Sequence, residues 1–156
     1  MSRPSRELKQ AESAIHTVIE SLIESQEALV EIGEKLEDRA LKRYFLTESL
    51  RRAQFRGELE SVLNQEGVSD FRECGGTAAT LRHGWASLRF RPQGGDPTLL
   101  ATAELGEDAA REVYVNAIHA VLPQPVRQLL SSQAAHIQES HDYVKAALDR
   151  AKKHAA

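Results

Sequence analysis

The residues of this sequence that could do chemistry are carboxylates and an imidazole that interrupt otherwise apolar stretches. Glu48, Glu107 and His141 each fall where a spacing of three or four residues would otherwise place an apolar side chain. Glu104 lies one helical turn before Glu107, and Glu24 lies at the margin of an apolar stripe. An ionisable side chain on a buried face is costly unless it is paired or bound to a metal. These five residues are therefore the candidate metal ligands, and no catalytic residue is assigned.

Carboxylates and imidazoles inside a helical bundle are ligands suited to iron and related transition metals. Di-iron carboxylate bundles take one Glu from each of two helices and Glu-x-x-His from each of the other two. This sequence departs from that pattern. It has Gln138-x-x-His141, with an amide in place of the carboxylate, and Glu48-x-x-Arg51, with a guanidinium that cannot bind a metal.

The competing interpretation is a buried polar network without a metal. Arg51 or Arg52 can neutralise the carboxylates with paired hydrogen bonds, so that no metal is needed. This interpretation is favoured because two positions of the di-iron pattern carry residues of the wrong kind, Gln138 and Arg51. The sequence leaves a partial metal site open as the alternative, with iron or another transition metal as the possible cofactor.

Four long stretches position these residues, and in each the apolar side chains recur every three or four positions, as is typical of helices. Gly and Pro separate the stretches. No strand signal is present, so we expect an all-α fold. The first expected helix spans about residues 6–34, and the second follows a short polar connection at Glu37 and Asp38 and stops at Gly67. The third opens at Asp96, which can cap it, with Pro97 at its first position, and ends before Pro123. The fourth begins near Pro125.

The connections between these helices have unequal lengths. The first and second helices, and the third and fourth, are joined by a few residues, whereas roughly thirty residues separate the second from the third. This pattern predicts a ferritin-like four-helix bundle with one long crossover. Within the crossover, Thr77 can cap a short helix that carries Leu81, Trp85 and Leu88. We expect a single domain over residues 1–156.

Counting from the turns places several candidates at one depth. On the first helix, either Ser25 or Gln26 continues the apolar stripe after Leu22. Gln26 and Glu48 each lie about 11 residues from the first turn, and Glu104 and His141 lie about 18 and 19 residues from the second. A long crossover puts the two turns at opposite ends of the bundle. These four residues would then share one level, with Glu107 one turn away.

Composition narrows the class of protein. The chain has 156 residues, with 20 Lys and Arg against 23 Asp and Glu, and this net charge of −3 weighs against a nucleic-acid binder. Hydrophobic residues at 41% argue against disorder. Cys74 is alone, the N-terminus lacks the apolar run of a signal peptide, and no stretch reaches the ~18 apolar residues of a membrane span. We expect a cytoplasmic protein that contacts neither membrane nor nucleic acid.

Several short runs resemble a bacterial ferritin-like four-helix-bundle family that is catalogued as a domain of unknown function. The runs are Arg52-Ala53-Gln54-Phe55 with Glu58-Leu59, Leu81-Arg82-His83-Gly84-Trp85, Glu104-x-Gly106-Glu107-Asp108 followed by Tyr114, and His141-Asp142. In the family the crossover run looks more like Leu-His-Arg-Gly-Trp, so Arg82 and His83 stand here in swapped order. The resemblance spans nearly the whole chain and implies the ferritin-like fold.

The resemblance adds only an analogy to metal or oxidative-stress chemistry. The sequence therefore predicts a non-enzymatic bundle with a polar cluster at its middle and an interaction or stress-related role. The alternative is a protein that binds iron or another transition metal and supports oxidase or storage chemistry. A homodimer is expected from the class of fold.

Overall fold

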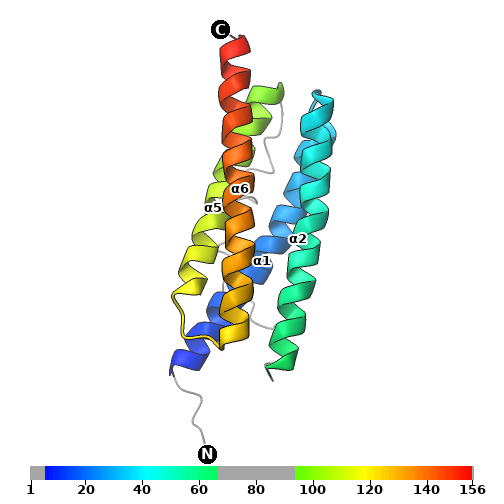
Figure 1. Cartoon of the computed structure of the whole chain (residues 1–156). Coiled ribbons are helices and arrows are strands. Elements are labelled where there is room, and N and C mark those ends of the chain that lie inside the picture. The colour runs from blue at the N-terminus through cyan, green and yellow to red at the C-terminus, as the bar shows by residue number, and fades with distance from the viewer. Residues whose placement is uncertain (1–5, 67–93, 156) are drawn as a thin grey trace, which may run out of the picture.

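The computed structural model describes residues 6–66 and 94–155, and nearly all of these residues are helical. The described chain forms four helices in a bundle (Figure 1), which confirms the expected all-α four-helix fold. In chain order they are α1 (Arg6–Lys35), α2 (Arg39–Gln65), α5 (Asp96–Ile118) and α6 (Gln124–Ala155). No helix of these described segments is both long enough and apolar enough to cross a membrane.

Local sequence explains where the helices begin and end. The Asp38 side chain caps α2 by accepting a hydrogen bond of 3.0 Å from the backbone N–H of Leu41. Pro97 stands in the first turn of α5, as its fixed φ angle favours. The expected Asp96 cap is wrong: Gly95 is the N-cap of α5, because the Asp96 carboxylate is bonded to the α1/α2 turn instead. This helix ends at Ile118, earlier than its expected end before Pro123. The guanidinium of Arg127 donates hydrogen bonds to the backbone carbonyls of Ile118 and Ala120 and so satisfies this early end.

The carboxylate of Asp96 fixes the relative direction of the helices. It accepts hydrogen bonds from the backbone N–H groups of Glu37, at 2.9 Å, and Asp38, at 3.0 Å. The start of α5 is thereby tied to the turn between α1 and α2. Helices α2 and α5 consequently run in the same direction, so that Glu66, after the end of α2, and Asp96, at the start of α5, lie at opposite ends of the bundle (Figure 1).

Each helix packs against two others. α1 contacts α2 and α5, and α6 contacts α5 and α2, so that α2 and α5 lie diagonally across the bundle. The two short turns lie at opposite ends, as the unequal connections predicted. The short helix expected from Thr77 to Leu88, with Trp85, lies outside the described residues.

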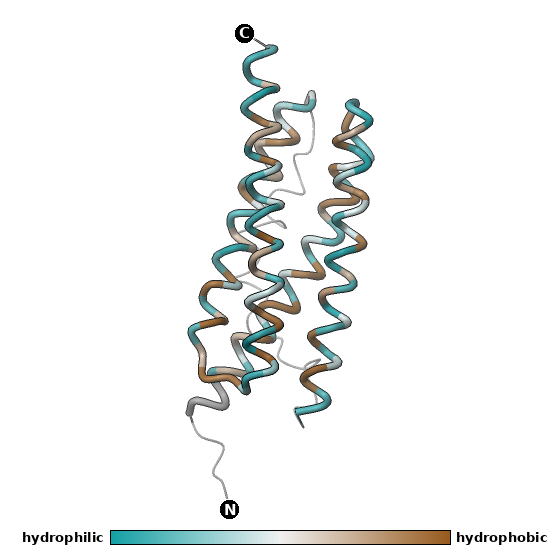
Figure 2. The backbone as a smooth tube through the Cα atoms, viewed as in Figure 1, coloured by the Kyte–Doolittle hydropathy of each residue, from teal (hydrophilic) through white to brown (hydrophobic). Residues whose placement is uncertain are grey.

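Buried positions recur at alternating spacings of three and four residues, the spacing of side chains that interlock between helices. Along the helices, brown apolar positions alternate with teal polar ones (Figure 2). From α1 to the residue that follows it, the buried positions with this spacing are Ala11, Ile15, Val18, Leu22, Ser25, Leu29, Ile32 and Leu36. On α6 they are Val126, Leu130, Gln133, Ile137, Ser140, Val144 and Ala147.

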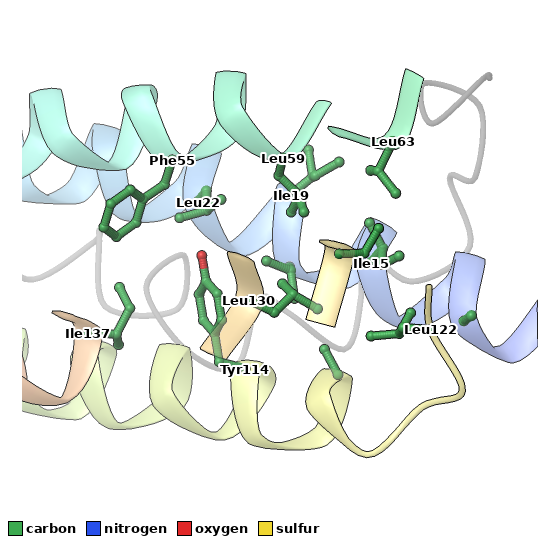
Figure 3. Packing of buried hydrophobic residues seen from close by; sticks show 14 of the residues in the cluster. Ile15, Ile19, Leu22, Phe55, Leu59, Leu63, Tyr114, Leu122, Leu130 and Ile137 are labelled. Atoms are coloured by element: carbon green, nitrogen blue, oxygen red, sulfur yellow. The ribbon is translucent and has the colours of Figure 1, made fainter. Parts of the chain in front are cut away.

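The apolar core is divided into two clusters, one toward each end of the bundle. The first, called here the turn-distal cluster, lies away from the α1/α2 turn and contains Leu22, Leu59 and Leu130. Figure 3 shows Phe55 and Leu59 from α2 facing Tyr114 from α5 across this cluster. The second, the turn-proximal cluster, contains Leu29, Phe45 and Val144. A group of buried polar residues, including Glu48, Arg52 and Glu107, lies between the two.

Candidate functional site

A layer of polar side chains separates the two apolar clusters at the middle of the bundle. We call it the charged layer, and all four described helices contribute to it. Its members are Ser25 from α1, Glu48 and Arg52 from α2, Glu107 from α5, and His136 and Ser140 from α6. All of these side chains are buried except His136, whose imidazole is 21% exposed.

Arg52 is the centre of the charged layer. Its side chain is 0% exposed, and its Nη2 atom lies 2.7 Å from Oε2 of Glu107 on the diagonally opposite helix. Its Nε atom lies 3.3 Å from Oε2 of Glu48, one turn earlier on α2. One guanidinium therefore pairs with two buried carboxylates from two helices. Such a charge is tolerated in a core only with this kind of pairing.

Ser140 on α6 adds two hydrogen bonds to this pair. Its hydroxyl donates to Oε2 of Glu107, the same oxygen that Arg52 contacts. Nη2 of Arg52 in turn donates to the Ser140 hydroxyl at 3.2 Å. The three side chains form a closed triangle that joins α2, α5 and α6.

His136 extends the network toward the surface along the seam between α2 and α6. Its Nε2 atom lies 2.7 Å from Oε1 of Glu48, and because a carboxylate only accepts, we assign the proton to Nε2. The imidazole also packs edge-on against the ring of Phe55, with 5.3 Å between ring centroids. Glu48 thus bonds Arg52 with one oxygen and His136 with the other.

A second polar contact crosses the same seam within the turn-distal cluster. The hydroxyl of Tyr114 donates to Oε1 of Gln133 at 2.8 Å, and Nε2 of Gln133 donates to the backbone carbonyl of Phe55 at 3.0 Å. Tyr114 is 1% exposed. The Tyr114 hydroxyl and both polar atoms of the Gln133 amide are hydrogen-bonded, so this is a satisfied core contact.

The electrostatics of the charged layer follow from burial and pairing. Burial alone lowers the pKa of Arg52, but the adjacent Glu107 and Glu48 carboxylates outweigh it and raise the pKa above its usual value. Arg52 is therefore a permanent cation. Burial raises the pKa of Tyr44, whose ring stacks on Tyr143, to about 12. Burial likewise raises the pKa of Tyr114 above its usual range.

The structure brings together two of the five expected ligands and places the others elsewhere. Glu48 and Glu107 meet at Arg52. Glu104 and Glu24 are only partly buried. His141 lies at the α5/α6 seam with its side chain 12% exposed, 3.3 Å from Asp142 and 3.9 Å from Asp108.

Glu48 lies in the middle of the bundle, as expected, but on each of the other three helices the residue that faces inward at this depth differs from the expected one. The inward residues beside Glu48 are Ser25 rather than Gln26, Glu107 rather than Glu104, and Ser140 rather than His141. On α1 and α6 the expected and observed residues are neighbours in the sequence, and on α5 they are three positions apart. A shift of one residue turns a side chain about 100° around the helix, which is enough to move it off the inward face.

Sequence reasoning named Arg52 as a possible partner of the carboxylates, and the structure confirms it. It missed Ser140 and His136. Ser140 could have been found, because the spacing from Val126 through Ile137 to Ala147 alternates four and three without a break only if residue 140 faces inward. His136 carries no such signal, since it lies beside the apolar stripe and not on it.

A metal ion at this level would have to displace Arg52, because the guanidinium bonds both carboxylates that the metal would use. Across residues 6–66 and 94–155, no group of three or more His, Cys, Asp or Glu side chains is arranged to hold a metal ion. Glu107 accepts hydrogen bonds from a guanidinium and a hydroxyl. These groups are hydrogen-bond donors that stabilise a free carboxylate, and a guanidinium cannot bind a metal ion.

The fold and site define a four-helix bundle with an arginine-centred charged layer. Residues 10–120 of the chain match the model of a domain of unknown function, DUF2383. Since this match covers more than half of the chain, the protein belongs to the DUF2383 family. The matched range includes Glu48, Arg52 and Glu107, whereas His136 and Ser140 lie beyond its end. No curated protein matches the chain.

Proposed function

We propose that this protein is a non-enzymatic, ferritin-like four-helix bundle in which Arg52 takes the charge role that metal ions have in di-iron bundles. The main support for this proposal is the pairing of the fully buried Arg52 with Glu107 at 2.7 Å and with Glu48 at 3.3 Å. The guanidinium of Arg52 is paired with both inward carboxylates, Glu48 and Glu107. Oxidase or storage chemistry would require these two carboxylates to be free to bind a metal ion.

The ferritin-like part of the proposal rests on topology. The two short turns lie at opposite ends, α2 and α5 run in the same direction, and the polar residues gather at mid-length. These are the features of a bundle with one long crossover, as in ferritin-like folds. Similarity of fold supports the class and not an activity.

Because the buried polar residues pair with one another, we assign the function to the surface of the bundle. We propose that the protein is cytoplasmic, binds no nucleic acid and acts by association, first as a homodimer and then with a protein partner in a stress-related role. Leu50 is 70% exposed, and Leu105 and Val121 are each 62% exposed, which supplies apolar area for contact. Sedimentation equilibrium tests the dimer, and a monomer at all concentrations would contradict it.

The decisive experiment on the interior compares metal binding before and after removal of Arg52. Elemental mass spectrometry of the purified protein and thermal melting with added Fe(II) are measured for the wild type, Arg52→Ala and Arg51→Ala. We expect no stoichiometric metal and no melting shift for the wild type. Arg52→Ala frees the two carboxylates, so we expect divalent cations to stabilise this variant.

Arg51→Ala is the matched control. Arg51 has the same charge and is the neighbouring residue, but its side chain is 48% exposed and its Nε lies 3.8 Å from Glu48. It should behave like the wild type. Stoichiometric metal in the wild type, with a melting shift lost in Glu48→Gln or Glu107→Gln, would overturn the proposal and establish the metal-binding alternative.

A further inference from the structure

Three buried polar atoms of the charged layer have no hydrogen-bond partner among the residues of the described structure. They are Nη1 of Arg52, Oε1 of Glu107 and Oγ of Ser25. All three side chains are 0% exposed. Buried polar atoms are nearly always satisfied by protein or by ordered water, so three orphaned atoms in one layer call for a common partner.

The Arg52–Glu107 contact and the register of α1 place the three side chains at one level of the bundle. Nη1 of Arg52 and Oε1 of Glu107 are each two covalent bonds from an atom of the 2.7 Å contact between the two side chains. Ser25 lies about as many residues before the α1/α2 turn as Glu48 lies after it, which puts the Ser25 hydroxyl at the same depth. Since α1 packs against both α2 and α5, its inward side chain at this level faces Arg52 and Glu107.

Ser25 is also a small residue for its place in the core. On the alternating stripe of α1 it stands between Leu22 and Leu29. A serine fills much less of the interior than these leucines do. Small side chains beside unsatisfied polar atoms are the setting in which buried water is found.

The chemistry of the three atoms selects the ligand. Nη1 of Arg52 is a donor and needs an acceptor, Oε1 of Glu107 is an acceptor and needs a donor, and the Ser25 hydroxyl can be either. A ligand that serves all three must both donate and accept hydrogen bonds. A metal ion cannot accept from a guanidinium, and a halide cannot donate to a carboxylate.

We propose that the charged layer binds one internal water molecule between Arg52, Glu107 and Ser25. The water accepts from Nη1 of Arg52, donates to Oε1 of Glu107 and donates to Oγ of Ser25. These three hydrogen bonds are the usual number for a buried water. The molecule links α1 to the Arg52–Glu107–Ser140 triangle, which otherwise joins only the other three helices.

This inference rests on the metal-free layer proposed above, and a high-resolution crystal structure tests both. We expect an ordered solvent peak within hydrogen-bond distance of all three atoms, without anomalous signal. A metal ion bound by Glu48 and Glu107 would overturn both proposals. A layer without solvent, in which Arg52 still pairs with Glu107, would overturn the water site alone.

Solution measurements on a pair of serine variants provide the second test. Oxygen-17 relaxation dispersion counts long-lived internal waters in the wild type, Ser25→Ala and Ser21→Ala. Ser21 is also buried on α1, one turn earlier, and has no orphaned atom, so it is the matched control. We expect Ser25→Ala to lose one long-lived water and Ser21→Ala to lose none. Equal counts in the three proteins would contradict the site.

Discussion

The charged layer and the turn-distal cluster occupy neighbouring levels of one bundle but are stabilised in different ways. In the turn-distal cluster, Leu22, Leu59 and Leu130 contribute through buried apolar area, and side chains of similar volume can replace one another. In the charged layer, Arg52 is tolerated only because named atoms face it at 2.7 and 3.3 Å. The apolar level needs volume, whereas the polar level needs specific partners.

This difference affects what a single substitution does. Removing one partner of a buried ion pair leaves the other charge uncompensated, while replacing the whole group with apolar residues can be neutral or stabilising. Removing a leucine leaves only a cavity. We therefore expect the charged layer to specify which helices meet at this level more than it adds to stability.

The largest effect is expected from Arg52→Ala, which leaves the buried Glu48 and Glu107 carboxylates without their cation. We expect the free energy of unfolding to fall by about 3–5 kcal/mol, measured by urea denaturation. Arg51→Ala should stay within about 0.5 kcal/mol of the wild type because its side chain is half exposed. A loss of similar size in both variants would show that pairing at Arg52 is not special.

A truncation in the turn-distal cluster should be costly by a different mechanism. Leu130 is 0% exposed, and we expect Leu130→Ala to lower the free energy of unfolding by about 2–5 kcal/mol through lost burial and a cavity. Leu130→Met conserves volume and should cost less than about 1.5 kcal/mol. If Met were as damaging as Ala, this level would also require specific shape.

A smaller effect is expected at the outer edge of the charged layer. His136→Ala removes the 2.7 Å contact to Oε1 of Glu48, and we expect a loss of about 1–3 kcal/mol because that buried oxygen loses its closest partner. His141→Ala is the control, since its contacts to Asp108 and Asp142 are at 3.9 and 3.3 Å near the surface. It should cost less, and the reverse order would contradict the assignment of the layer.

The smallest effect is a dependence on alkaline pH. Burial raises the pKa of Tyr44 from its ordinary 10.0 to about 12, so the unfolded chain loses this proton first as the pH rises. The contribution is complete below pH 10, and stability falls between pH 10 and about 12. Denaturation followed across this range should show a shallower decline for Tyr44→Phe. An unchanged slope would show that Tyr44 titrates as an exposed tyrosine.

The fold was accessible from the sequence because its signals are local. The apolar spacing and Pro97 each act within one or two turns, and they place helix starts close to the observed ones. The unequal connections set the direction of the helices. The end of α5 was placed late because the carbonyls at Ile118 and Ala120 are satisfied by Arg127 from the next helix, which is a tertiary contact.

The site was only partly accessible for a related reason. Glu48 and Glu107 interrupt long apolar stripes, so their inward direction follows from spacing alone. Near Ser140 and His141 two neighbouring polar residues compete, and either fits a spacing of three or four from Ile137. The choice between them depends on the rotation of α6 against α2 and α5.

The sequence by itself determined four amphipathic helices, two turns at opposite ends, and carboxylates at the middle of the bundle, because these depend on interactions within a few residues. Only the tertiary structure decided that Ser140 and not His141 faces the core, and that Arg52 holds both carboxylates. Those outcomes depend on the rotation and depth of each helix. Packing among all the helices fixes both quantities, and no single stretch of sequence encodes them.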